Sequence, residues 1–405
     1  MRFLRTASTR RLLGVIGAVA AAIAACAAVA VAATSGGPVP RREPLARAIH
    51  QALNAPAVSG ITARVTFTNN LIGSSQIQGT DPLLQGATGR LWYAPAAHEL
   101  RIELQSTNGD AQVLVHNRSF WMYDPSLQTV YEGTLPALVR SRAHPRGQEQ
   151  IPSVNEIQSG ISRLAQHLSL SGARPGDIAG EPAYTVRVAP RQGGGLLSAI
   201  QLGWDAVRGV PLQFAVYARG DSTPVLELSA TNISFGRVAV SDFAITPPAG
   251  AKVVRLSSAP GAPAQDRGVE SKAKRPQVTG VAAVQRGLSF RLAAPATVAG
   301  LARNTVALVH LGARPSALVT YGQGLGAIVV LEQASSSGHG SLGSMAAQGS
   351  DGQGLSLPAV SIHGTRGQEL ETALGTVIRF TRDKVSYTVL GSVKAAEARA
   401  AARGL

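Results

Sequence analysis

Short segments in which apolar and polar residues alternate run through the first two thirds of this chain. A period of two gives a strand one buried and one solvated face, which is typical of an antiparallel sheet. The pattern therefore predicts an antiparallel sheet with one apolar face. In the first two segments, 61–69 and 98–106, the apolar positions are Ile61, Ala63, Val65 and Phe67, and then Leu100, Ile102 and Leu104.

Two helical segments interrupt the strands. Residues 44–54 begin at Pro44 and repeat apolar residues at helical spacing. Residues 153–170 begin at Ser153, with Glu156 three positions later as in a capping box. Their apolar face is Ile157, Ile161, Leu164 and Leu168. The order helix, strands, helix, strands predicts an α+β fold, with one large curved antiparallel sheet and the helices on its concave face.

The length of 405 residues predicts two domains. We assign the large sheet to residues 41–250. Residues 251–283 are rich in proline and serine, lack a periodic apolar signal, and are interpreted as a linker. Residues 284–405 are expected to form a second, smaller, β-rich α+β domain, with strands that include 288–295 and a terminal helix over 396–405.

The first 35 residues are predicted to be a targeting segment. Residues 1–11 are basic, and residues 12–33 are uncharged and apolar. Three alternatives remain open: a cleaved signal peptide, an uncleaved membrane anchor, and lipidation at Cys26. Each alternative places the body of the protein outside the cytoplasm, in the cell envelope, either secreted or peripheral, or anchored by this segment.

Composition argues against several classes of protein. The net charge is +15, but the basic residues are spread along the chain rather than gathered with stacking aromatics, so we expect no nucleic-acid partner. Cys26 is the single cysteine, and the eight histidines show no paired spacing, so no metal and no cofactor is predicted. No nucleophile and base pattern is discernible, and the protein is predicted not to be an enzyme.

Two phrases carry a family resemblance. A strand ending in Trp204-Asp205 is followed by a turn and Pro211, and a later segment reads Asp242-Phe243 before Pro247-Pro248. Their order over about residues 44–253 resembles the LolA/RseB (MucB)-like superfamily of envelope proteins, which includes carriers of outer-membrane lipoproteins. Residues 318–333 and 377–393 resemble a small β-rich module of membrane-anchored, anti-sigma-linked envelope proteins.

The resemblance implies an unclosed β-barrel around a hydrophobic cavity, with helices as a lid. In LolA-like proteins this cavity holds acyl chains of lipoproteins, and RseB-like proteins restrain an anti-sigma factor. The first hypothesis is thus a non-enzymatic protein that binds a lipid, an acylated peptide or a lipoprotein and associates with the membrane. The alternative is a regulatory sensor acting on a membrane-bound anti-sigma factor, a membrane-protein partner.

Large apolar residues on the strands are the candidates for lining such a cavity. A sheet face that packs on a helix and one that lines a cavity have the same pattern, so Trp92 and Phe120, like the candidates, either fill the core or contact a ligand. The candidate ligand-binding residues are Val65, Phe67, Leu100, Ile102, Leu104, Trp121, Trp204 and Phe214.

Overall fold

The computed structural model describes residues 39–73, 77–78, 81–107, 109–135, 151–193, 195–256, 278–311, 314–335, 354–355 and 357–405. The predicted targeting segment, with Cys26, lies outside these residues. Within them, no helix is both long and apolar enough to cross a membrane.

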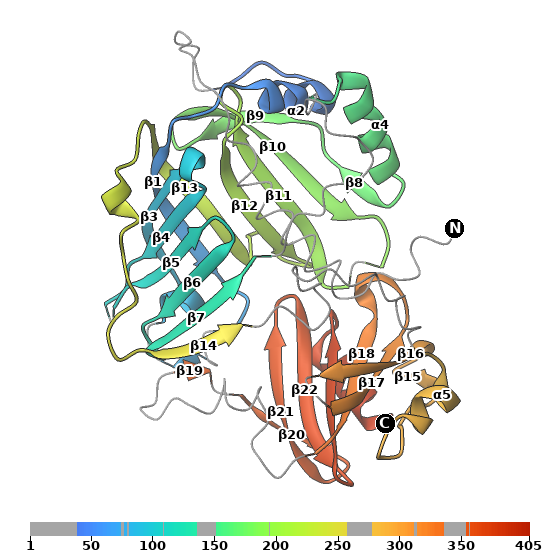
Figure 1. The fold of residues 1–405 in the computed structure, drawn as a ribbon. Helices are drawn as coiled ribbons and strands as arrows, with labels where there is room; N and C mark the ends of the chain where they lie inside the picture. The colour runs from blue at the N-terminus through green and yellow to red at the C-terminus, as the bar shows by residue number, and fades with distance from the viewer. Residues whose placement is uncertain are drawn as a thin grey trace, which may run out of the picture.

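Most of the chain before residue 257 forms one 13-stranded sheet, shown in Figure 1. Its strand order is β14-β7-β6-β5-β4-β3-β1-β13-β12-β11-β10-β8, with β9 paired to β10. Every pairing is antiparallel except that of β14 with β7, and β14 lies in the segment expected to be a linker. The bounds are β1 (Ile61–Asn69), β3 (Gly86–Ala94), β4 (Glu99–Leu104), β5 (Ala111–His116), β6 (Ser119–Asp124), β7 (Thr129–Thr134), β8 (Leu168–Leu170), β9 (Arg174–Ile178), β10 (Glu181–Pro190), β11 (Leu197–Asp205), β12 (Pro211–Ala218), β13 (Leu226–Phe235) and β14 (Lys252–Leu256).

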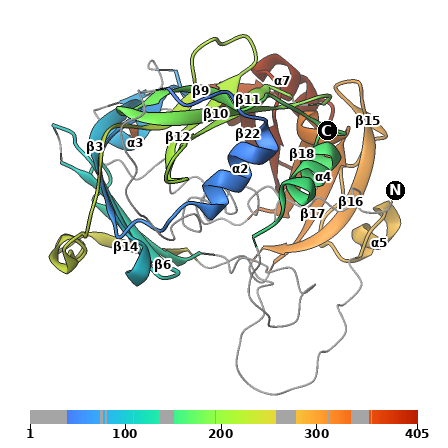
Figure 2. The same ribbon diagram turned by 90° about the horizontal axis from the view of Figure 1, so that it is seen from above.

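Helices α2 (Leu45–Asn54) and α4 (Val154–Leu164) lie on the concave side of this sheet, as Figure 2 shows, and α3 (Pro82–Gln85) is a single turn before β3. The predicted fold, a large curved sheet with helices on its concave face, is confirmed. The capping box at Ser153 is present as well. The prediction that the second helix continues to residue 170 is wrong, because Leu168–Leu170 pair with β10 instead. Backbone pairing with a neighbouring strand outweighs the helical spacing there.

The second sheet has eight strands in the order β15-β16-β17-β18-β23-β22-β21-β20. Helix α7 buries its alanines on this sheet, while residues 288–295, expected to be a strand, form a loop that packs on the same core. A two-stranded pair joins β2 (Ile77–Gln78) to β19 (Gly354–Leu355). The other bounds are α5 (Val281–Arg286), β15 (Thr297–Val298), β16 (Leu301–Leu311), β17 (Arg314–Tyr321), β18 (Ile328–Ala334), β20 (Ala359–Ile362), β21 (Thr365–Thr372), β22 (Gly375–Arg382), β23 (Val385–Gly391) and α7 (Ala395–Arg403).

The two sheets touch through backbone hydrogen bonds at one end of the first. The Leu196 amide donates to the Ser392 carbonyl at 3.1 Å, and the Gly326 amide donates to the Gly193 carbonyl at 2.9 Å. Gly195 has φ +58°, and a Cβ there would overlap the carbonyl of Ser392. Only glycine fits such a position, because it combines a left-handed backbone with close approach of another chain segment.

Candidate functional site

The strand register sorts the side chains of the first sheet into two faces, because residues paired across antiparallel strands point the same way. Ile102 pairs with Leu91 on β3 and with Val113 on β5. On the other half of the sheet, Leu202 pairs with Phe214. We call the face that carries these residues the inner face. It also holds Val65, Phe67, Tyr93, Leu100, Leu104, Val115, Phe120, Met122, Tyr184, Val186, Ile200, Trp204, Val216, Leu228, Ile233 and Phe235.

The inner face is the concave one. The Tyr184 hydroxyl donates to the Arg41 carbonyl, just before α2, and Val58, between α2 and β1, packs in the same cluster as Val65. The segment before α2 therefore crosses this face at β10. The lid helices α2 and α4 lie over the same side in Figure 2.

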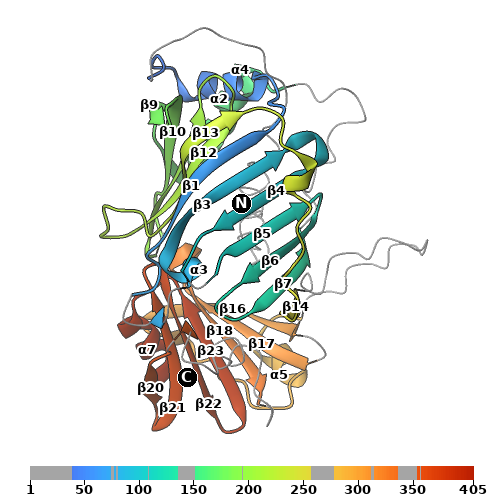
Figure 3. The same ribbon diagram turned by 90° about the vertical axis from the view of Figure 1, so that its left-hand side faces the viewer.

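Charged side chains of the central strands lie on the opposite, outer face. This holds for every charged residue of β1, β3, β4 and β13, all of which the structure describes fully, and for Arg187 of β10. Arg101, for example, pairs with Glu103 at 2.6 Å and donates to the Asp242 carbonyl at 2.9 Å. Residues 243–250 run as a loop along this outer side (yellow in Figure 3). The inner side of β1, β3, β4 and β13 is therefore free of charge.

Seven of the eight candidate residues lie on the inner face. Val65 and Leu104 are buried, whereas Phe67, Leu100, Ile102, Trp204 and Phe214 are half-buried. Whether they bind a ligand stays a prediction. Sequence reasoning missed Tyr184, Leu202 and Leu228, although the alternation in 183–188, 200–204 and 226–229 already carried the signal.

The placement of Trp121 was wrong. Its strand β6 has large apolar residues on both faces, so alternation alone does not say which one points inward. The register pairs Trp121 with Leu114 and Glu132 on the outer face and turns Phe120 and Met122 inward. Trp92 is likewise an outer residue, stacked against the Arg101 guanidinium at 4.7 Å. Both tryptophans are therefore removed from the candidate site.

The lid helices leave part of their apolar faces uncovered. None of the residues of α4 is buried, and Leu164 at its end is 52% exposed, while Leu53 of α2 is 41% exposed. The two helices pack chiefly on each other, joined by a 2.9 Å hydrogen bond between His50 Nδ1 and the Pro152 carbonyl. An open hollow of about 530 Å³ lies on the surface of α4 and is lined only by residues 152–163, which include Ile157. The lid thus covers the inner face without closing tightly on it.

We expect Ser153→Ala to loosen this lid. The Ser153 hydroxyl accepts from the Glu156 amide, and the Glu156 carboxylate accepts from the Ser153 amide at 2.8 Å. Loss of a serine N-cap costs about 1 kcal/mol. Hydrogen exchange of α4 amides should rise by about fivefold, whereas Ser159→Ala, which removes a bond within the helix, should change it little. Equal exchange in the two variants would show that the cap does not hold α4.

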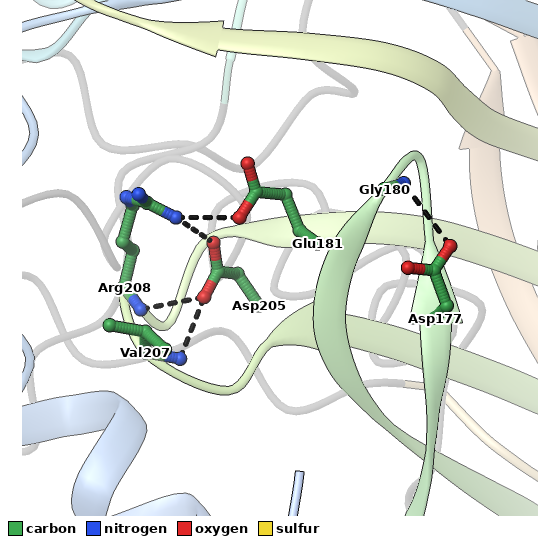
Figure 4. Close-up of polar contacts among 6 residues, drawn as sticks. All are labelled: Asp177, Gly180, Glu181, Asp205, Val207 and Arg208. Atoms are coloured by element: carbon green, nitrogen blue, oxygen red, sulfur yellow. Dashed lines mark hydrogen bonds and ion pairs between the residues drawn. The ribbon is translucent and has the colours of Figure 1, made fainter. Parts of the chain in front are cut away.

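The turn between β11 and β12 forms the lid end of the site, shown in Figure 4. The fully buried Asp205 carboxylate accepts from the Val207 and Arg208 amides at 2.7 and 2.8 Å. The Arg208 guanidinium binds Asp205 and Glu181 and lies 4.1 Å from the Phe235 ring on the inner face. In the same turn, a Cβ at Gly209 would overlap a backbone carbonyl oxygen of α2. The turn therefore sets where α2 rests.

Trp204 places one polar atom on the inner face near this end. Its ring lies 6.0 Å from that of Tyr184, and its buried Nε1 has no hydrogen-bond partner among the described residues. An indole N–H left without a partner in an apolar setting is costly, and it is a ready donor to an oxygen atom of a ligand.

A second buried polar group lies in the core of the second sheet. Glu332 of β18 is fully buried, and its Oε2 accepts from the Ala293 amide at 2.9 Å. Its Oε1 and the Tyr321 hydroxyl have no partner among the described residues. Burial raises the pKa of the Glu332 carboxyl to about 7, against a lowering influence from Arg382. Within the described residues no cluster of histidine, cysteine and acidic side chains is suited to hold a metal.

This carboxyl gives the fold a pH dependence. The unfolded chain releases the Glu332 proton near the ordinary pKa of 4.5, and the folded protein holds it up to about 7. The free energy of unfolding therefore falls as pH rises through this window, by about 3 kcal/mol from this group.

Glu332→Gln should remove the contribution of this carboxyl to the decrease in unfolding free energy with pH. The variant should therefore be more stable than the wild type at pH 8. Thermal unfolding between about pH 4.5 and 8 measures it. As a control, Glu369→Gln breaks the Glu369–Arg399 ion pair and should destabilise the fold at pH 8. Parallel pH profiles for the wild type and Glu332→Gln would contradict the assignment.

No family model and no curated protein sequence matches this chain. Among solved structures, it is similar to the complex of Pseudomonas aeruginosa MucA and MucB, at 16% identity and a TM-score of 0.39, over 88% of this chain and 94% of that one. It is also similar to a LolA superfamily protein from Nitrosomonas europaea, at 10% identity and a TM-score of 0.21, over 50% and 98%. A lipoprotein-sorting protein domain from Vibrio parahaemolyticus gives 12% identity, a TM-score of 0.19, and coverage of 50% and 96%.

Proposed function

We propose that the inner face of the first sheet binds the acyl chain of a lipid, an acylated peptide or a lipoprotein, and that the protein is a carrier or sensor in the cell envelope rather than an enzyme. The observation that carries the proposal is the inner face itself. The charged side chains of the central strands point away from it, its apolar side chains are largely half-buried, and the helices above it keep apolar side chains exposed.

The energetics favour an apolar ligand of this kind. Each methylene moved from water into an apolar site contributes about 0.8 kcal/mol, so a dozen contribute about 10 kcal/mol. Association costs at least about 4 kcal/mol, which leaves a net binding free energy of at most about 6 kcal/mol and a Kd of tens of micromolar. Trp204 Nε1 would donate to the carboxyl or ester oxygen at the head of the chain and so fix its direction.

A displacement titration tests the proposal. A fluorescent fatty acid is bound to the full chain and displaced with palmitic acid, and micromolar competition is expected. Before the titration, the protein is exchanged into detergent and the detergent is then removed, so that lipid acquired during purification is lost. A protein that binds neither the fluorescent acid nor palmitic acid after this treatment would contradict acyl-chain binding.

A regulatory role is the second candidate, favoured by the edge strand β14. β14 pairs only with β7 among the described strands, and Val253 and Leu256 on it are 50% and 46% exposed. An exposed apolar edge accepts an added strand from a partner. The extracytoplasmic segment of a membrane-bound anti-sigma factor is the probe. Binding that Val253→Pro leaves unchanged would contradict strand addition at this edge.

A further inference from the structure

The tip of the β21–β22 hairpin in the second sheet reaches into the first. Ala373 and Leu374 pack in one cluster with Phe214, Val216 and Leu226 of the first sheet. Phe214 and Val216 are inner-face residues, paired with Leu202 and Ile200 on β11. Figure 1 shows this hairpin rising to the end of the first sheet that is opposite the lid helices.

Polar contacts hold the tip in place. The Ala373 amide donates to the Leu71 carbonyl at 2.8 Å, in the segment that follows β1. The Ser392 hydroxyl donates to the Leu374 carbonyl at 2.7 Å and accepts from the Leu196 amide at 3.0 Å, at the start of β11. The Thr372 hydroxyl closes the turn on the Gly375 carbonyl at 2.8 Å. The tip is therefore fixed to both halves of the first sheet.

The distance between the two ends of the inner face suits one acyl chain. Trp204, near the lid, and Ile200, level with the hairpin tip, are four residues apart on β11. At about 3.4 Å per residue this is about 14 Å. One leaflet of a bilayer has a hydrocarbon thickness of about 15 Å, half of the usual ~30 Å core.

We propose that the hairpin tip, Thr372–Gly375, is the floor of the acyl-chain site, and that the Leu374 side chain sets the chain length that binds best. This inference rests on the proposed function. The head of the chain lies at Trp204, and its methyl end meets Leu374. The second domain thereby completes a site whose walls belong entirely to the first.

Chain-length selectivity of the full protein tests the floor. Saturated fatty acids from dodecanoic to eicosanoic acid are competed against a fluorescent fatty acid. Leu374→Ala should move the optimum to longer acids by about three methylenes, the volume that the truncation removes. Each methylene newly accommodated should lower Kd about fourfold. Leu374→Trp should move the optimum to shorter acids.

Leu390→Ala is the matched control, since Leu390 lies in the same sheet and is 47% exposed. It should keep the wild-type optimum. Because Leu374→Ala removes packing between the sheets, a second measurement uses the unaltered chain: a fatty acid with a diazirine at its methyl end should crosslink to residues 373–374.

The outcomes separate the two proposals. A wild-type protein that binds fatty acids with a length optimum unmoved by both Leu374 substitutions, or with crosslinks away from the hairpin, would overturn the floor and leave acyl-chain binding standing. A wild-type protein that binds no fatty acid would overturn both.

Discussion

Val113→Asp should abolish acyl-chain binding. Val113 lies half-buried on the inner face, between Ile102 and Met122 on the neighbouring strands. A carboxylate there would have to be desolvated by the bound chain, at a cost of about 3 kcal/mol or more, which is at least about hundredfold in Kd. Displacement of a fluorescent fatty acid measures the loss.

The adjacent Leu114 supplies the control on the same strand. Leu114 is also half-buried, but it pairs with Arg101 and Trp121 on the outer face. Leu114→Asp should keep the wild-type Kd within about twofold, with thermal unfolding run on both variants to show that each is folded. Equal loss of binding in the two variants would mean that the inner face is not the site.

Asp205→Ala should cost about 3 kcal/mol of unfolding free energy. The Asp205 side chain is fully buried, accepts from two backbone amides, and pairs with Arg208 at 2.9 Å. Its removal leaves both amides without their partner and Arg208 with only Glu181. Breaking a buried pair costs about 3–5 kcal/mol, and the lower end applies because Arg208 is partly exposed. Urea unfolding measures the change.

Asp177→Ala is the matched control in Figure 4, because Asp177 also accepts from a turn amide, that of Gly180, but at an exposed position. It should cost less than about 1 kcal/mol. Asp205→Ala should also weaken acyl-chain binding, since the same turn supports α2. A cost at Asp205 no larger than at Asp177 would contradict the structural role of this turn.

Alternation in the sequence was sufficient to predict the sheet and most of its inner face. Ile102 could be placed because the residues on either side of it, Arg101 and Glu103, are charged. Alternation failed at Trp121, because both faces of β6 are apolar and only the pairing with β5 and β7 decides which way the side chain points. It also failed at Leu168, whose helical spacing matched α4 while its backbone pairs with β10.

The remaining parts of the site depend on contacts between distant segments. Leu374 is an ordinary hairpin residue in the sequence, and nothing local indicates that it reaches Phe214. Asp205 is visible as a turn residue, but its pairing with Glu181 and its burial depend on how β10 and β11 align. Periodicity reports the direction of a side chain relative to its own strand, whereas these roles depend on the partner strand.

Native mass spectrometry of the full chain, before and after incubation with phospholipid vesicles, tests the central claim most directly. We expect a mass increment of one lipid that organic solvent removes, that is present in the Leu114→Asp variant, and that is lost in Val113→Asp. A wild-type protein that carries no lipid in either condition, or a Val113→Asp variant that carries as much as the wild type, would contradict acyl-chain binding on the inner face.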